Sequence, residues 1–201
     1  MAAMALQNPL AVSPLVAYVA QLLRWNRVYN LTAVRQPQDI VVRHILDSLS
    51  ILPWVQGQSV LDVGSGAGLP GIPLAIMRPE IQFFLLDSNA KRTRFMTQVI
   101  AQLQLKNVEV LRCRVEDYQP RHLFDTVVSR AFSSLAAMLE VAGHLCASGG
   151  RLLAMKGQYP QQELQQLPPA YRLVAVHSLT VSGLDAARHL VHLEPLAADF
   201  E

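Results

Sequence analysis

The chain has few of the residues that covalent or metal cross-links require. Its 201 residues include only two cysteines, Cys113 and Cys146, which form no C-x-x-C pattern. Because no paired histidines stand at ligand spacing either, the sequence predicts reduced thiols and no bound metal. The core must therefore come from hydrophobic side chains, which make up 51% of the residues. That share, at this length, predicts one domain that folds without disulfide or metal support.

Long hydrophobic runs and an amino-terminal basic cluster are also missing. The longest nearly uncharged stretch near the start, residues 13–23, is interrupted by Tyr18 and Gln21. It is shorter than the roughly 20 apolar residues that a transmembrane helix needs. The first cation is Arg24, so no basic segment precedes an apolar one as in a secretory signal. Despite a mean hydropathy of +0.24, we therefore expect a cytoplasmic protein with no membrane partner.

Charged residues are sparse as well, at 16% of the chain, and the formal net charge is only +2. That excess is too small to indicate a nucleic-acid partner by itself. The charge is unevenly distributed, however: residues 87–130 hold 8 Lys and Arg against 5 Asp and Glu, whereas residues 131–201 hold 4 against 6. The basic middle third is either a solvated helix face or a weak phosphate-attracting patch. In the second case, affinity for a nucleic acid should fall steeply with salt.

The sequence contains two successive kinds of pattern. In residues 1–57, apolar residues recur at helical spacing; Ser13-Pro14 predicts the start of one helix, and Pro37 opens a second that ends before Pro53. From residue 58 to residue 201, short apolar runs alternate with helix-length segments, which is typical of strands buried on both faces of a sheet. These runs are residues 60–63, 83–86, 108–111, 126–128 and 152–155.

Two further apolar runs, residues 173–179 and 189–193, are joined by a loop of about ten residues. Such a loop is too short for a crossover helix, so these two strands should be antiparallel. The whole pattern predicts an α/β fold with a mostly parallel open sheet, one antiparallel edge strand and preceding N-terminal helices. We expect a single domain, with a helical extension over residues 1–57 and an α/β core over residues 58–201.

A glycine-rich loop, residues 62–71, follows the first apolar run and holds four glycines within eight positions. A tight strand-to-helix turn needs only one or two, so the loop indicates a ligand that rests against bare backbone. Its start, Asp62-x-Gly64-x-Gly66-x-Gly68, resembles the first motif of S-adenosylmethionine-dependent methyltransferases. In such enzymes the loop approaches the methionine portion of the cofactor, and an acid after the second strand holds the ribose hydroxyls.

A dinucleotide is the alternative ligand for this loop. The spacing Gly66-x-Gly68-x-x-Gly71, with Asp87 nineteen residues beyond Gly68, formally fits the dinucleotide fingerprint. A nicotinamide-dependent oxidoreductase is therefore a competing interpretation. Against it, the chain is too short for a separate catalytic domain, and no tyrosine has a lysine four places on, as single-domain dehydrogenases require.

Polar side chains follow the other apolar runs, whose carboxyl ends should meet at one edge of the sheet. Asp87 follows the second run and Glu116 the third, so they could contact the ribose and the adenine of a nucleoside. Each has a structural alternative: Asp87 could cap the next helix together with Ser88, and Glu116 could be a surface acid. Arg130 and Lys156 follow the fourth and fifth runs, which suggests an anionic or electron-rich substrate.

The sequence lacks the residues that two classes of methyltransferase use on their substrates. Enzymes that act on exocyclic base amines carry Asn/Asp-Pro-Pro-Tyr/Phe after the fourth strand, where this chain has Ser129-Arg130-Ala131-Phe132. Enzymes that methylate pyrimidine C5 need a cysteine at a strand end, whereas we place Cys113 within the third strand and Cys146 at the end of a helix. A ring nitrogen such as guanine N7 carries no proton, so it needs positioning and no general base.

Seven motifs can be compared with known families: Arg24-Trp25-Asn26-x-x-Tyr29-Asn30-Leu31-Thr32, Arg43-His44-Ile45-Leu46-Asp47-Ser48, the loop from Asp62 to Leu74, Leu86-Asp87-Ser88, Arg114-Val115-Glu116, Ser129-Arg130-Ala131-Phe132 and Lys156-Gly157. Together they resemble the GidB family, bacterial methyltransferases of small-subunit ribosomal RNA, over about residues 25–193. The resemblance implies a Rossmann-like methyltransferase fold and direct methyl transfer to N7 of a guanine in the 530 loop of 16S rRNA. It also implies S-adenosylmethionine contacts by Gly64, Gly66, Gly68, Leu69, Asp87, Val115, Glu116 and Arg130.

The residues themselves suggest, as a hypothesis, a division of labour. Arg130 should serve the cofactor and Lys156 the RNA, while the helical extension folds over the crevice and shapes the guanine pocket. The partner would be 16S rRNA or the 30S ribosomal particle, bound by a monomer. A non-catalytic RNA-binding module remains a third interpretation. The candidate substrate residues are Asn30, Arg43, His44, Asp47, Ser48 and Lys156, for which helix capping, surface polarity and salt bridges are the structural alternatives.

Overall fold

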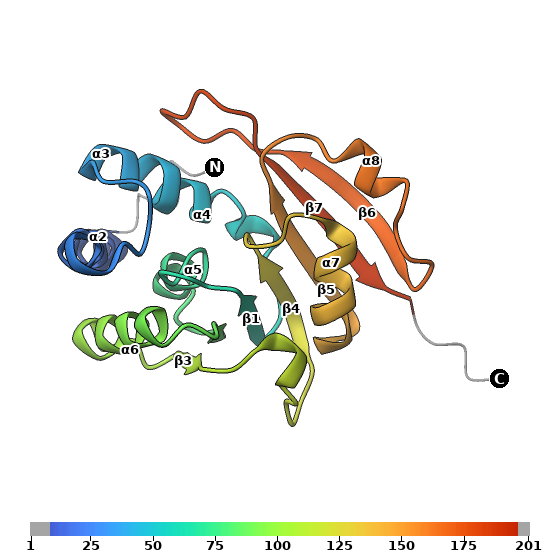
Figure 1. Cartoon of the computed structure of the whole chain (residues 1–201), viewed down its shortest axis with the longest axis horizontal. Coiled ribbons are helices and arrows are strands. Elements are labelled where there is room, and N and C mark those ends of the chain that lie inside the picture. Colours follow the sequence, from blue (N-terminus) through green and yellow to red (C-terminus); the bar gives the residue numbers. More distant parts are fainter. Residues whose placement is uncertain (1–8, 197–201) are drawn as a thin grey trace.

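The computed structural model describes residues 9–196, and its centre is one seven-stranded sheet (Figure 1). The strand order is β3-β2-β1-β4-β5-β7-β6. Every apolar run that the sequence indicated as a strand is one, with ends shifted by a few residues. The strands are β1 (Ser59–Val63), β2 (Gln82–Leu86), β3 (Val108–Leu111), β4 (Phe124–Ser129), β5 (Cys146–Lys156), β6 (Tyr171–Ser178) and β7 (His189–Pro195).

One strand, β7, runs against the others. It pairs antiparallel with both β5 and β6, whereas the pairs that involve β1 to β4 are all parallel. The predicted antiparallel arrangement of the last two strands is therefore confirmed, as is the mostly parallel, Rossmann-like sheet. The reversed strand lies one position in from the edge, because β6 is the outermost strand on that side.

Helices cover both faces of the sheet, with α2, α5 and α6 on one side and α7 on the other (Figure 1). The predicted helical segment before the sheet is also confirmed. The α-helices are α2 (Pro9–Tyr29), α3 (Pro37–Ile40), α4 (Asp47–Leu49), α5 (Gly71–Met77), α6 (Ala90–Leu103), α7 (Leu135–Ala142) and α8 (Gln161–Leu164). A π-helical turn, η1 (Val41–Leu46), joins α3 to α4, and 3-10 turns are η2 (Leu52–Trp54), η3 (Val115–Asp117) and η4 (Gly143–Leu145).

The first helix differs from expectation at its start. Because α2 runs through Pro14, the prediction of a helix start at Ser13 is wrong. Ala11 and Leu15, one turn apart, are only 3% and 5% exposed, and their burial offsets the backbone hydrogen bond that a proline removes. Further along the helix, the hydroxyl of the fully buried Tyr18 donates to the Ala67 carbonyl at 2.6 Å. The helix is thereby attached directly to the glycine loop.

The second helix also departs from the regular pattern that its apolar stripe predicted. It begins at Pro37 as expected, but its middle six residues, Val41–Leu46, form a π-helical turn. Such a turn inserts an extra residue into each hydrogen-bonded ring, and π-bulges are frequent at functional sites. The turn contains Arg43 and His44, and Asp47 follows it directly.

The helix after β2 has a buried apolar face that includes Phe95, Met96 and Val99, but its cap is not the residue that the sequence suggested. Asn89 is the N-cap of α6, and its side chain accepts hydrogen bonds from the N–H groups of Lys91 and Arg92. The prediction of Ser88 as the cap is wrong because the helix begins one residue later than expected. Within residues 9–196, no helix combines the length and hydrophobicity that crossing a bilayer requires.

A candidate active site of two adjoining cavities

Two cavities open side by side at the carboxyl edge of the sheet, where open parallel sheets bind their ligands. The small cavity, of about 240 Å³, lies over the ends of β1, β2 and β3, and Asp87 and Glu116 line it. The large cavity, of about 890 Å³, lies over the ends of β4 and β5 and the start of β7, and Asp47 and Lys156 line it. Phe132 lines both. A ligand in one cavity would therefore lie next to a ligand in the other.

The glycine loop forms the floor beside the small cavity, and its backbone is fixed to β2. The N–H of Gly64 donates to the Leu86 carbonyl at 2.8 Å. Gly64, Gly66 and Gly68 have φ values of 72°, 59° and 84°, a left-handed conformation that residues with a side chain adopt rarely. A Cβ added at Gly64 would also approach the Ala131 Cβ to 2.6 Å. Glycine is thus required there for both conformation and space.

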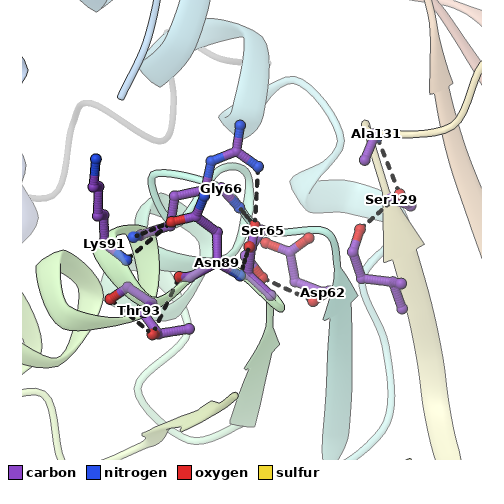
Figure 2. A network of polar contacts seen from close by, with 12 residues as sticks. Asp62, Ser65, Gly66, Asn89, Lys91, Thr93, Ser129 and Ala131 are labelled. Atoms are coloured by element: carbon purple, nitrogen blue, oxygen red, sulfur yellow. Dashed lines mark hydrogen bonds and ion pairs between the residues drawn. The ribbon is translucent and has the colours of Figure 1, made fainter. Parts of the chain in front are cut away.

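Asp87 joins the glycine loop to the end of β2. It is only 4% exposed, and its Oδ2 accepts a hydrogen bond from the Gly66 N–H at 2.9 Å, while Oδ1 accepts from the Asn89 N–H at 2.8 Å. The two donors, Gly66 and Asn89, are labelled in the polar network of Figure 2. The Arg92 guanidinium lies 3.4 Å from Oδ2. Asp87 therefore orients the loop and the start of α6, which is close to the helix-capping role that was the structural alternative to ribose binding. Oδ2 thus accepts from both Gly66 and Arg92, whereas Oδ1 keeps one further lone pair, and the residue lines the small cavity.

Two features beside the loop fit an amino-acid nucleoside as ligand. A Cβ at Gly66 would meet only the Gly64 carbonyl, at 3.9 Å, so space is open there. Asp62, fully buried in β1, accepts the Gly71 N–H through Oδ2 at 2.9 Å, while its Oδ1 has no hydrogen-bond partner among residues 9–196. Burial raises the pKa of this carboxyl to about 7. A buried oxygen without a partner requires an explanation, and a ligand ammonium is one that we had not assigned from the sequence.

The end of β3 supplies the other wall of the small cavity. Val115 is 9% exposed and Glu116 is exposed, and both line the cavity. The placement of Cys113 within the third strand is wrong: β3 ends at Leu111, where its pairing with Leu86 of β2 ends, and Cys113 lines the small cavity. Burial raises the pKa of the Cys113 thiol. The thiol therefore stays protonated near neutral pH and is a poor nucleophile.

In the large cavity, Asp47 holds two arginines from distant segments. Its Oδ2 lies 3.1 Å from Nη1 of Arg130, which follows β4, and its Oδ1 lies 2.8 Å from Nε of Arg188, which precedes β7. The Asp47 side chain is 3% exposed, whereas those of Arg130 and Arg188 are 27% and 25% exposed. The buried carboxylate thus fixes both guanidinium groups, while part of each arginine side chain faces the cavity.

His44 is held in its neutral form on the same wall. Its Nδ1 lies 2.9 Å from the Arg43 carbonyl, which can only accept, so Nδ1 carries the proton. Nε2, at 2.7 Å from Thr32 Oγ1, is then the acceptor of the threonine hydroxyl. Burial is the main cause of a lowered His44 pKa, and the Arg130 charge adds to it. Because both ring nitrogens are engaged, His44 is a structural and shape-determining group rather than a free base.

The segment before His44 completes this wall. Asn26, near the end of α2, accepts the Thr32 N–H through Oδ1 at 2.9 Å and donates through Nδ2 to the Val34 carbonyl at 3.1 Å. The Val34 N–H in turn donates to Thr32 Oγ1 at 3.2 Å. Two of the motifs that carry the family resemblance thus meet in one hydrogen-bond network, which positions the π-helical turn over the large cavity.

Lys156, at the end of β5, is ion-paired. Its Nζ lies 2.9 Å from Glu163 Oε2 and 3.1 Å from the Ser133 carbonyl, and its side chain is 11% exposed. The same Glu163 carboxylate accepts the Leu135 N–H at the start of α7. The salt bridge that was the structural alternative to RNA binding by Lys156 is therefore present in the fold. The residue still lines the large cavity, with Tyr159 and His189 nearby.

The predicted site residues separate into groups. Gly64, Asp87, Val115 and Glu116 line the small cavity, and Gly66, Gly68 and Leu69 belong to the loop beside it. Arg43, His44, Asp47, Arg130 and Lys156 line the large cavity. Arg130 lines the large cavity and not the small one, and its contact with a cofactor remains a prediction. Ser48 is fully buried, and its hydroxyl has no hydrogen-bond partner within residues 9–196, whereas Asn30 is exposed and bonds Arg35; the linings of both cavities omit these two.

Sequence reasoning missed Arg188, Glu163 and Tyr159, all of which line the large cavity. Arg188 lies 141 positions from its partner Asp47, and no local spacing indicates that contact. In residues 9–196, no group of three or more His, Cys, Asp or Glu side chains is arranged to hold a metal ion.

Comparison with known families and proteins gives a consistent result. A sequence model of the GidB family, described as rRNA small subunit methyltransferase G, matches residues 11–191. The chain is 52% identical over 187 residues to Ribosomal RNA small subunit methyltransferase G of Nitrosococcus oceani, covering 93% of this chain and 87% of that protein. It is 55% identical over 181 residues to the protein of the same name from Stutzerimonas stutzeri, covering 89% and 84%.

The fold is also found in solved structures. Magnesium protoporphyrin IX methyltransferase from Synechocystis PCC 6803, solved with bound SAM, superposes with a TM-score of 0.64 over 86% of this chain and 90% of that one. The identity is 17%, so this likeness concerns the fold alone.

Proposed function

Because this chain belongs to the GidB family, rRNA small subunit methyltransferase G, we propose that it transfers a methyl group from S-adenosylmethionine to N7 of a guanine in the 530 loop of 16S rRNA. The observation that carries the proposal is the pair of adjoining cavities that share Phe132. The small cavity takes the cofactor and the large cavity takes the base. The methyl group then crosses a short distance where the cavities meet.

The small cavity suits the cofactor in its chemistry. The free lone pair of Asp87 Oδ1 can accept a ribose hydroxyl, and Val115 offers an apolar surface for adenine, with Glu116 at its polar edge. The unpaired Oδ1 of Asp62 offers an acceptor for the ammonium of the methionine portion. When bound, S-adenosylmethionine supplies a methyl group on a positively charged sulfur, which is a strong electrophile.

The large cavity suits a purine base and its phosphates. Arg43, Arg130, Arg188 and Lys156 line it against the carboxylates Asp47 and Glu163, which leaves an excess of positive charge. The paired N–H donors of an arginine guanidinium can bind a phosphate or the oxygen on the edge of a purine. Tyr159, 53% exposed and in edge contact with His189, offers a ring against which a base can stack.

The residues of the large cavity also fit a reaction without a general base. Guanine N7 has an in-plane lone pair and no proton, so the base receives the methyl group directly, in line with the departing sulfur. His44 is neutral with both nitrogens engaged, and Lys156 is paired with Glu163. The task left for the protein is to hold the two reactants in a reactive orientation, which alone can lower the barrier by about 7–11 kcal/mol.

The proposed target is tested by mapping N7-methylguanine in 16S rRNA from cells with and without this gene. We expect one modified guanine in the 530 loop to lose its methyl group when the gene is deleted. An unchanged map would overturn the target while leaving the cofactor assignment in place. Isolated 16S rRNA and assembled 30S particles should be compared as substrates of the purified protein.

The cofactor is tested separately by calorimetry with S-adenosylhomocysteine and with NADH. We expect saturable binding of the first and none of the second. Binding of NADH alone would support the oxidoreductase interpretation, and binding of neither would support a non-catalytic RNA-binding module.

A further inference from the structure

A third hollow lies away from both cavities, between α2 and α6. This helix groove has a volume of about 410 Å³ and shares no lining residue with the small or large cavity. Five of its residues come from α2 and two from α6. They are Gln21, Arg24, Trp25, Val28, Tyr29, Gln98 and Gln102.

The two helices that form the helix groove carry positive charge only. Neither Pro9–Tyr29 nor Ala90–Leu103 contains an aspartate or glutamate. Of their five cations, Arg92 is paired with Asp87. The other four make no ion pair with any part of the chain that the structure describes; they are Arg24, Arg27, Lys91 and Arg94. Such a surface attracts an anionic partner.

The cations of α6 are in line with the groove. Lys91, Arg94, Gln98 and Gln102 are spaced by three, four and four residues, so they share one face of the helix. At 1.5 Å per residue, this row is about 16 Å long. It begins beside Arg92, which lines the small cavity, and ends with the two glutamines that line the helix groove.

The groove also presents an aromatic surface. The ring of Trp25 packs edge-on against the buried Phe95, with 5.5 Å between centroids, and Tyr29 lies against Trp25 at 5.2 Å with the planes inclined by 33°. Trp25 is thus fixed by the core, while Tyr29 remains 38% exposed. An exposed ring held on a rigid neighbour is a platform on which an unpaired base can stack.

We propose that the helix groove binds an unpaired segment of the substrate RNA, outside the reaction centre. Bases stack on Tyr29, the glutamine amides contact base edges, and Arg24 and Arg94 hold the phosphates. An acidic protein segment would use the cations but has no need of the exposed ring and the three amides. RNA therefore matches more of the groove than an acidic peptide does.

The chain path connects the helix groove to the large cavity. α2 ends at Tyr29, and only five residues later Val34 lines the large cavity. Between them, the Arg35 guanidinium bonds the exposed Asn30 side chain at 3.4 Å, which adds another cation along the path. One RNA strand can therefore contact both places, and the groove would hold the RNA while the target base enters the large cavity.

This inference rests on the proposed function, and the first test uses Tyr29. A full-length 16S rRNA transcript is the probe, with Tyr29→Ala compared to Tyr29→Phe. Loss of a stacking ring should weaken RNA binding by about fivefold to a hundredfold, whereas the phenylalanine variant should bind like wild type. Tyr29 is partly exposed, so the thermal midpoint and the affinity for S-adenosylhomocysteine should stay at wild-type values.

The second test uses the cations and a matched control. Removing two phosphate contacts in the double variant Arg24→Ala, Arg94→Ala should reduce the slope of log affinity against log salt by about 1.4. The control is the double variant Lys106→Ala, Arg121→Ala, which removes the same charge from exposed positions outside the groove. The control variant should lower the slope by less than half as much as the double variant in the groove does.

The outcomes separate this inference from the proposed function. If wild type neither binds nor methylates 16S rRNA, the proposed function fails. If wild type does both and the groove variants equal wild type, or equal the control pair, only the helix groove is overturned. Polyglutamate serves as a competitor: if it displaces the RNA fully and Tyr29→Ala binds as well as wild type, the groove is a site for acidic protein, which also overturns the proposal.

Discussion

The small and the large cavity lie on the same edge of one sheet but are built in different ways. In the small cavity, backbone groups fix the functional side chains: Asp87 is held by the N–H groups of Gly66 and Asn89. In the large cavity, side chains hold one another, as Asp47 does with Arg130 and Arg188, which are 83 and 141 positions away. The first design depends on local chain geometry, and the second on contacts that form only in the complete fold.

This difference has a consequence for how each cavity responds to substitution. A backbone-built site loses mainly the contribution of the altered side chain. A site built from shared ion pairs loses the position of every partner at once, because an unpaired guanidinium moves or recruits another anion. The large cavity should therefore be the more sensitive of the two, and the substitutions below test that ranking.

The largest effect is expected for Asp47→Asn. The substitution keeps the size of the side chain but removes the charge that holds Arg130 and Arg188. Displacement of positioning groups by about 1 Å can cost about a hundredfold in rate. We expect methyl transfer to 16S rRNA to fall about a hundredfold, mostly in kcat, while the affinity for S-adenosylhomocysteine changes less than threefold. Steady-state kinetics and calorimetry measure the two quantities.

Asp125→Asn is the matched control for Asp47. Asp125 is also a structural carboxylate, and its Oδ2 accepts the Gln58 and Ser59 N–H groups at 2.7 and 3.0 Å, at the start of β1 and outside the linings of both cavities. This variant should lose stability but keep its activity per folded molecule. Equal losses of activity in both variants would show that Asp47 supports only the fold, and would break the ranking of the two cavities.

The next effect is expected for Asp87→Ala. The substitution removes the hydrogen bonds to Gly66 of the glycine loop and to Asn89 before α6, the pairing with Arg92 and, in the proposed complex, a contact with the ribose. Hydrogen bonds to charged groups contribute about 1.5–3 kcal/mol each, so affinity for S-adenosylhomocysteine should fall well over tenfold. Calorimetry measures this, and the affinity for RNA should remain within twofold of wild type. Near-normal cofactor affinity would mean that the carboxylate serves only the loop and the helix start.

The sequence anticipated the small cavity better than the large one. Strands and loops of a parallel sheet have a local signature, so the apolar runs and the glycine spacing predicted where Gly64, Asp87 and Glu116 come together. The placement of Cys113 was wrong although the apolar run itself ends at residue 111, as β3 does. The error came from extending the strand beyond its apolar run.

The composition of the large cavity could be recognised only from the structure. The motif with Arg43, His44 and Asp47 could be recognised, but its π-helical turn could not, because the stripe of apolar residues fits an ordinary helix as well. Arg188 and Glu163 gave no signal, since each is a single charged residue in a polar loop or short helix. Their significance comes from partners far along the chain, and a single sequence carries no record of such pairs.

A pH-dependent effect on stability is expected for Asp62→Asn. Burial raises the pKa of Asp62 in the folded protein to about 7, against about 3.9 when unfolded. Between those values the folded state holds a proton that the unfolded state has lost, so wild-type stability falls as pH rises from about 4 to 7. Asparagine keeps an acceptor for the Gly71 N–H and never ionises.

The stability advantage of Asp62→Asn over wild type should therefore grow by about 2–3 kcal/mol between pH 5 and pH 8. Urea unfolding at both pH values measures it, and only the difference between the variants is compared, because other groups titrate in both. The same variant should bind S-adenosylhomocysteine more weakly than wild type. A stabilised variant with unchanged cofactor affinity would remove Asp62 from the proposed site.

The smallest effect is expected for Glu116→Gln. Glu116 lines the small cavity like Asp87, but it is exposed and its side chain makes no hydrogen bond with any residue from 9 to 196 that would fix it. Water competes for an exposed acceptor, and glutamine keeps a carbonyl oxygen for the adenine amino group. Affinity for S-adenosylhomocysteine should therefore change by about threefold or less. A loss of tenfold would mean that the cavity closes over the cofactor and buries this carboxylate, so that the small cavity, like the large one, would depend on charge.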